Sequence, residues 1–211
     1  MTFYEYFISH HSRIIKLTLE HSRIALTALI IGVILGVIIG ILISIFKKLS
    51  GPVLNIANVI YTIPSLALFT LMIPLIGIGK FSAIVALVLY SQLIIIRNTY
   101  TGIVEVDQSI IDAALGLGMN TFQIMFKVKL PLAFPVIMTG VRISAVIMVA
   151  STIIANTIGA GGLGFYIFQG LSTLNTNMIL AGTIPSLILA NILDLILRGI
   201  EMWVKKRWLV T

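Results

Sequence analysis

Three long stretches of this chain contain no Asp, Glu, Lys or Arg, and they limit its possible folds more than any other feature. They are residues 24–46, 49–79 and 143–193, with 23, 31 and 51 residues. A helix of about 18 to 20 apolar residues is enough to span a bilayer. Only 10% of the 211 residues are charged, whereas a soluble domain has roughly 25%. The chain is therefore predicted to be an all-α polytopic membrane protein.

Hydropathy and helix breakers divide the chain into five predicted transmembrane helices within one domain, residues 1–211. The predicted spans are residues 23–46, 54–78, 81–101, 132–157 and 178–204. Residues 1–21 are too polar for the core of a signal peptide, and their apolar residues recur near helical spacing. We expect them to form an interfacial amphipathic helix before the first span. Pro64 and Pro74 are each expected to break the second span.

Two glycine patterns carry structural predictions. Gly32, Gly36 and Gly40 recur at intervals of four residues, which is typical of helices that pack closely in membranes. Residues 159–164 read Gly-Ala-Gly-Gly-Leu-Gly. This segment is expected to interrupt the helix between the fourth and fifth spans, because glycine disfavours a helix interior.

The distribution of basic residues predicts the orientation. Five spans place the two chain ends on opposite sides of the membrane. If the C-terminus is cytoplasmic, the cytoplasmic segments hold seven basic residues: Lys47, Lys48, Lys127, Lys129, Lys205, Lys206 and Arg207. The outer segments then hold four: Arg13, Lys16, Arg23 and Lys80. The positive-inside rule therefore favours an external N-terminus, a cytoplasmic C-terminus and a cytoplasmic loop over residues 105–131. Orientation also explains the net charge of +7 without a nucleic-acid partner.

No catalytic or metal site is expected. The chain has no cysteine, and its three histidines, His10, His11 and His21, all lie in the polar N-terminal segment. It also lacks the Gly-x-x-x-x-Gly-Lys-Ser/Thr loop that cradles nucleotide phosphates. We therefore predict that the chain is not an enzyme and binds no cofactor itself.

The 105–131 loop is the one long polar segment inside the chain. Ser109 and Asp112 have the spacing of a capping box, so a short helix is expected to begin at Ser109. Gly116 and Gly118 should weaken or end it, and Pro131 can open the next span.

This loop also resembles a known motif. Asp112-Ala113-Ala114, three residues, Gly118, nine residues and then Val128-Lys129-Leu130-Pro131 is similar to the EAA loop in permease subunits of ABC importers. That pattern is Glu-Ala-Ala, three residues, Gly, nine residues, Ile, any residue, Leu-Pro. Asp112 and Val128 depart from it conservatively. The resemblance implies that residues 112–118 form a coupling helix that docks in a groove of a separate ATPase subunit, which would carry the ATP and Mg.

Further similarity points to a substrate class. The segments 61–69, 73–79 and 158–164 resemble osmoprotectant permeases for glycine betaine, carnitine and choline. This implies a prokaryotic plasma-membrane subunit that pairs with an identical or paralogous permease and receives substrate from an extracytoplasmic binding protein. Methionine importer permeases look much alike over 158–164, so a methionine or amino-acid importer is an alternative. A passive pore is a third reading.

Several residues are candidates to line the pathway: Tyr61, Pro64, Ser65, Tyr90, Arg142 and Asn156. Aromatic faces suit a quaternary ammonium through cation–π contacts. Asn156 could instead hydrogen-bond between helices. Arg142 either faces the pathway or pairs with Asp112 or another loop group. Asp194 and Arg198 are four residues apart and are expected to pair with each other.

Overall fold

The computed structural model describes residues 2–208, and within this range the chain forms helices and no strands. The predicted domain also includes residue 1 and residues 209–211, which lie outside the described residues. The longer helices are α1 (Phe3–Ile45), α2 (Ser50–Thr62), α3 (Ser65–Ile76), α4 (Lys80–Val104), α7 (Leu130–Ala155) and α9 (Thr176–Trp208). The shorter elements are η1 (Lys47–Leu49), α5 (Gln108–Gly116), α6 (Thr121–Ile124), the π-helical turn η2 (Met125–Lys129), η3 (Asn156–Ile158) and α8 (Gly164–Ser172).

Four helical stretches of the described chain are long and apolar enough to cross a bilayer. They are α1, α4, residues 121–158 and α9. A fifth span results if α2 and α3 are counted together, although their axes differ by 99°. The all-α membrane fold with several spans is therefore confirmed.

The N-terminal segment differs from the expectation. Residues 3–45 form one continuous helix, so no separate helix ends near residue 21. Thr2 and Glu5 form a capping box at its start, and the sequence contains no proline before Pro52 that would interrupt it. At about 1.5 Å per residue, this 43-residue helix is roughly 65 Å long, about twice the hydrocarbon thickness.

The second span is broken once, at Pro64. Ile63 and Pro64 both have extended backbone angles, because a proline disfavours helical geometry in the residue before it. The predicted break at Pro74 does not occur. Pro74 lies in the last turn of α3, which ends at Gly77 with a φ of 95°.

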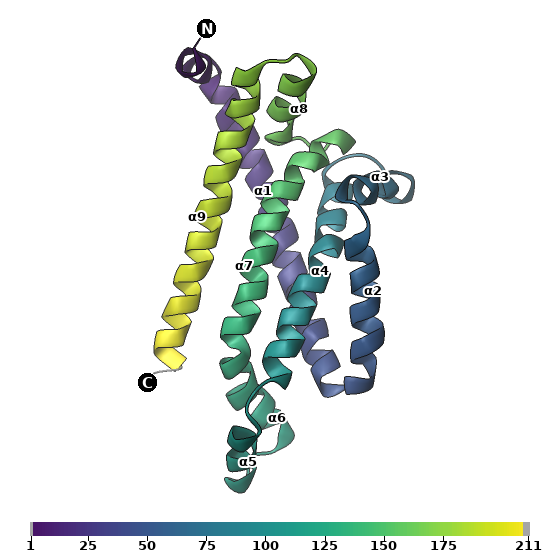
Figure 1. Ribbon diagram of the computed structural model, residues 1–211, viewed down its shortest axis with the longest axis vertical. Coiled ribbons are helices and arrows are strands. Elements are labelled where there is room, and N and C mark those ends of the chain that lie inside the picture. The colour runs from purple at the N-terminus through teal and green to yellow at the C-terminus, as the bar shows by residue number, and fades with distance from the viewer. Residues whose placement is uncertain (1, 209–211) are drawn as a thin grey trace.

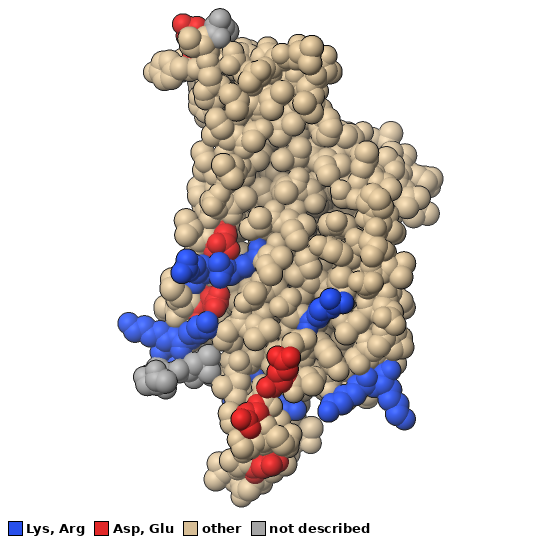
Figure 2. Space-filling view, in the orientation of Figure 1, with Lys and Arg blue, Asp and Glu red and all other residues tan. Residues whose placement is uncertain are grey.

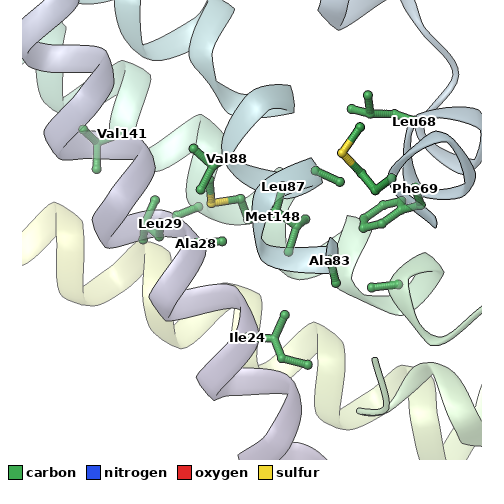
Figure 3. Close-up of a cluster of buried hydrophobic side chains, with 14 of the residues drawn as sticks. Ile24, Ala28, Leu29, Leu68, Phe69, Ala83, Leu87, Val88, Val141 and Met148 are labelled. Atoms are coloured by element: carbon green, nitrogen blue, oxygen red, sulfur yellow. The ribbon is translucent and has the colours of Figure 1, made fainter. Parts of the chain in front are cut away.

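The bundle core is formed by α1, α4 and α7, which pack against one another. The glycine stripe of α1 faces α4, as predicted from its spacing. A methyl group at Gly36 would lie 2.6 Å from Cγ2 of Ile95, and one at Gly40 would lie 2.7 Å from Cγ2 of Thr99. Only glycine therefore permits this approach. Figure 3 shows the apolar cluster between these helices, including Ala28, Leu87 and Met148.

The two ends of the bundle carry different elements (Figure 1). The α1–α2 turn, α5, α6 and the C-terminal end of α9 lie at one end, whereas the start of α1, α3 and α8 lie at the other. On the face shown in Figure 2, nearly all the charged side chains gather in the half of the molecule that contains α5 and α6. The polar loop that the sequence singled out therefore projects from the more highly charged end.

Candidate functional site

The 105–131 loop folds into two short helices that project from the bundle (Figure 1). The helix α5 begins two residues earlier than predicted, counted from N-cap to N-cap. Its N-cap is Asp107, whose side chain accepts a hydrogen bond from the Ser109 N–H at 2.8 Å. The predicted capping box of Ser109 and Asp112 is therefore wrong, because Asp107 takes the capping position first. Hydrogen bonds from Ser109, first from its side chain and then from its backbone, lower the pKa of Asp107.

The residues of the resembled motif lie on and just after α5. Asp112 is exposed and accepts a hydrogen bond from Nε2 of Gln108 at 2.8 Å. Ala113 is also exposed, whereas Ala114 is buried. Gly118 ends the helical segment with a φ of 78°, a left-handed conformation that favours glycine. Its N–H donates to the carbonyl oxygen of Leu115 at 2.9 Å.

The second half of the loop leads directly into a span. Asn120 and Gln123 form a capping box at α6, and the π-helical turn η2 joins α6 to α7. Leu130 is the first residue of α7, and Pro131 follows it in the first turn, as predicted. A displacement of α5 and α6 would therefore act on α7 through a continuous helical connection.

Sequence reasoning missed three of the apolar side chains that this loop exposes, namely Leu117, Phe122 and Phe126. Leu117 is 83% exposed, and Leu115, Phe122 and Phe126 are also exposed. The rings of Phe122 and Phe126 lie 4.5 Å apart. Their spacing of four residues, which places both rings on one side of a helix, was the available signal. Exposed apolar groups of this kind mark interaction surfaces.

The structure brings together two of the pathway candidates. The rings of Tyr61 on α2 and Tyr90 on α4 are stacked with their centroids 4.9 Å apart. Pro64 lies at the bend and Ser65 is the first residue of α3, directly after α2. Asn156 lies in η3, after the end of α7. Arg142 contacts α9.

The guanidinium of Arg142 bridges α7 and α9. It donates from Nε and Nη2 to the two carboxylate oxygens of Asp194, at 2.8 and 3.1 Å, and from Nη1 to Glu201 at 3.3 Å. Glu201 also pairs with Lys205 at 2.8 Å. The predicted pairing of Asp194 with Arg198 is therefore wrong among the described residues, because Arg142 offers Asp194 a bidentate partner.

Arg142 and Asp194 both line an open groove. The groove has a volume of about 440 Å³ and is lined by Thr139, Arg142, Ile143, Val146, Ile147 and Asp194. The side chains of Arg142 and Asp194 are 27% and 32% exposed. Ionisable groups inside a span usually face the bundle interior or a water-filled cavity and pair with one another. Here the guanidinium of Arg142 already donates hydrogen bonds to both the Asp194 and the Glu201 carboxylates.

The three histidines do not gather in one place. His10 stacks on Tyr6 at 4.2 Å, and His21 is fully buried with its Nε2 3.0 Å from the carbonyl oxygen of Val149. Between residues 2 and 208, no group of three or more His, Cys, Asp or Glu side chains is placed to hold a metal ion.

Comparison with known proteins identifies the family. Residues 32–207 match the family described as "Binding-protein-dependent transport system inner membrane component". The chain belongs to this family. The match includes the whole 105–131 loop and all the spans except the first part of α1.

Named relatives in this inner membrane component family include osmoprotectant permeases. The choline transport system permease protein OpuBB of Bacillus subtilis is 43% identical over 184 residues, which cover 87% of this chain and 85% of that protein. The glycine betaine/carnitine/choline transport system permease protein OpuCB of the same organism is 41% identical, with 86% and 84% covered. The carnitine transport permease protein OpuCB of Listeria monocytogenes is 38% identical, with 87% and 84% covered.

The fold is similar to that of a solved importer. A chain from the inward-facing MetNI methionine ABC transporter has a TM-score of 0.82 and 25% identity, and the match covers 90% of this chain and 95% of that one. The resemblance drawn from the EAA-like loop and the 61–79 segments is therefore confirmed at the level of the family and the fold.

Proposed function

We propose that this chain is the permease subunit of an ATP-driven importer that takes up quaternary-ammonium osmoprotectants, namely glycine betaine, carnitine or choline. The observation that carries this proposal is the 38 to 43% identity to permeases with these substrates in their names over most of both chains. The stacked Tyr61 and Tyr90 rings add a physical argument, because aromatic faces attract a cation that has no proton to donate.

The subunit needs partners to work. The family description names a binding protein, which we propose delivers substrate at the end that carries α3 and α8. Two permease subunits, identical or paralogous, enclose the pathway. An ATPase dimer binds the 105–131 loops and holds the ATP and Mg, since this sequence has no phosphate-binding loop of the Gly-x-x-x-x-Gly-Lys-Ser/Thr form. We place the N-terminus outside and the C-terminus in the cytoplasm of a prokaryotic cell.

Within the loop, the ATPase contacts are assigned to six residues. They are Asp112, Ala113, Ala114, Gly118, Leu130 and Pro131. Exposed Asp112 and Ala113 face the partner, whereas buried Ala114 lets α5 lie close to its own loop. Gly118, with its positive φ, sets the direction in which the chain leaves α5. Leu130 and Pro131 connect the loop to α7. The exposed Phe122 and Phe126 extend this surface.

We assign the pathway to Tyr61, Pro64, Ser65, Tyr90 and Asn156. The bend at Pro64 supports this assignment, because irregular backbone at membrane depth is tolerated where it lines a cavity or is buried in protein. For Arg142 we propose a structural role instead, since two carboxylates satisfy its guanidinium.

The test is uptake of labelled glycine betaine, carnitine, choline and methionine by cells with and without this chain and its ATPase. We expect uptake of at least one quaternary ammonium compound to require both. The likeness to the methionine transporter gives a second candidate. Methionine uptake that betaine does not compete for would favour it. Flux through the purified chain without ATP would indicate a passive pore and would contradict both importer proposals.

A further inference from the structure

Three segments meet at one carboxylate, at the end of the bundle opposite the 105–131 loop. Oε2 of Glu20 on α1 accepts a hydrogen bond from the Gly162 N–H at 3.1 Å. Oε1 pairs with the ammonium of Lys80, the first residue of α4. We call this contact the Glu20 junction. It attaches both the glycine loop, residues 159–163, and the α3–α4 turn to the same helix.

The glycine loop is shaped to receive these side chains. Gly161 and Gly162 have φ values of 85° and 81°. A methyl group at Gly161 would lie 2.6 Å from Oε2 of Glu20, and one at Gly162 would lie 3.2 Å from Nδ1 of His21. Each glycine therefore permits a close approach of the neighbouring α1 side chain.

The α3–α4 turn also contacts the glycine loop region directly. The Gly79 N–H donates to the carbonyl oxygen of Ile158 at 2.9 Å. The short helix α3 ends just before this turn, and α8 begins just after the glycine loop. The Glu20 junction therefore lies where both short helices of this end are attached to the long ones.

The residues that hold the junction from α1 precede the part of the chain that defines the family. The family match begins at residue 32, whereas Glu20 and His21 lie about three turns earlier on the same helix. The long first half of α1 therefore has a specific contact to make, in addition to its packing.

We propose that Glu20 is a positioning residue whose carboxylate holds the glycine loop and the α3–α4 turn against α1, and that this contact opens when the outer end of the pathway opens. This rests on the proposed function, because alternating access requires that end to open. The side chains of Lys80 and Glu20 are 58% and 26% exposed. A partly exposed ion pair adds little net stability, so it can break and re-form while the apolar core stays intact.

The absence of native cysteine gives a direct test. Ala160, in the glycine loop, is fully buried, so Ala160→Cys places one thiol where solvent does not reach it in the closed loop. The measurement is the rate at which a membrane-impermeant maleimide modifies this thiol in the full chain in membrane vesicles. Leu163→Cys, at another fully buried position of the loop, is the second reporter if the first variant fails to insert.

We expect Glu20→Gln to raise the modification rate about three- to fivefold, because the loop samples open states more often once the ion pair is lost. Lys80→Gln should act in the same direction. The matched control is Arg23→Gln, which removes an exposed positive charge three residues after Glu20 on α1 and should leave the rate unchanged. Unchanged rates in both Glu20→Gln and Lys80→Gln, or an equal rise in the control, would overturn the proposal.

A second measurement tests opening during transport. This measurement uses the Ala160→Cys variant that keeps Glu20. With the ATPase, the binding protein and ATP present, its thiol should react faster with the maleimide than in the same complex without ATP. A rate that stays constant through the cycle would overturn the opening step. Thiol reactivity uses no transported substrate, so a wrong substrate assignment would appear in the uptake assay and leave this result unaffected.

Discussion

The two ends of the bundle are held together by different kinds of contact. In the 105–131 loop the side-chain hydrogen bonds join near neighbours, such as Asp107 with Ser109 and Asn120 with Gln123. At the opposite end, Glu20 reaches Gly162, 142 residues away, and His21 lies against the Val149 carbonyl, 128 residues away. The loop can therefore be altered without disturbing the bundle, whereas the Glu20 junction joins segments that are far apart in the chain.

The largest difference is expected between two glycines, one at each end. A methyl group at Gly164 would collide with the carbonyl oxygen of Ile153 and lie 2.7 Å from Cβ of Asn156, whereas one at Gly116 meets nothing within 4 Å. We expect Gly164→Ala to destabilise the protein by about 1–3 kcal/mol through overpacking. Gly116→Ala should be neutral or stabilising by up to about 1 kcal/mol.

Folded yield and thermal unfolding in detergent measure this difference. Equal behaviour of the two alanine variants would mean that the start of α8 relaxes as freely as the 105–131 loop, and the contrast between the ends would be lost.

For transport activity we expect the opposite: a substitution in the 105–131 loop should lower uptake without lowering stability. We expect Asp112→Arg to lower ATP-driven uptake at least about tenfold, because a reversed charge in a docking surface opposes association. Folded yield should stay normal, since Asp112 is exposed and its hydrogen bond is local. Asp112→Glu, the residue of the resembled motif, is the matched control and should retain uptake. Normal uptake in the arginine variant, with expression confirmed, would remove this residue from the coupling surface.

Substitutions at Arg142 test whether a contact between distant residues also stabilises the part of the bundle between the two ends. Arg142→Leu would leave Asp194 and Glu201 without this partner within a span. We expect the thermal midpoint to fall by roughly 3–10 °C. The double variant Arg142→Leu/Asp194→Leu should recover part of that loss, because one unpaired carboxylate is removed with its partner. A double variant that is less stable than Arg142→Leu would argue against a structural pair.

The smallest effect is expected at the α5 cap. Asp107→Ala should raise hydrogen exchange of the first-turn amides of α5 only a few-fold, and Asp107→Asn should preserve protection because it keeps an acceptor. The pKa of Asp107 is lowered in the folded loop. Its contribution is therefore present at neutral pH, above the unfolded pKa, and is lost as the pH falls through the lowered folded pKa.

Hydrogen exchange of the α5 amides, measured at a series of decreasing pH values, tests whether the Asp107 cap is lost at low pH. Protection of α5 that disappears already at neutral pH would show that another group controls the cap.

The sequence predictions that the structure confirms depend on near neighbours in the chain, although some local predictions were wrong. The interval of Gly32, Gly36 and Gly40, the break at Pro64 and the entry of Pro131 into α7 depend on residues close in the chain, and the structure contains all three. The cap at Ser109 was misassigned because Asp107, two residues earlier, competes for the same position. The expected helix over residues 1–21 merges with the first span, since polarity alone does not end a helix.

The sequence by itself determined that the chain crosses a membrane and where the polar 105–131 loop leaves it, because uncharged runs and local motifs act over a few turns of helix. Only the tertiary structure decided that Arg142 pairs with Asp194, that Tyr61 stacks on Tyr90, and that Glu20 holds Gly162. These contacts depend on the relative rotation and depth of packed helices. That geometry is set by close-packed side chains across the whole core, and no short stretch of sequence contains it.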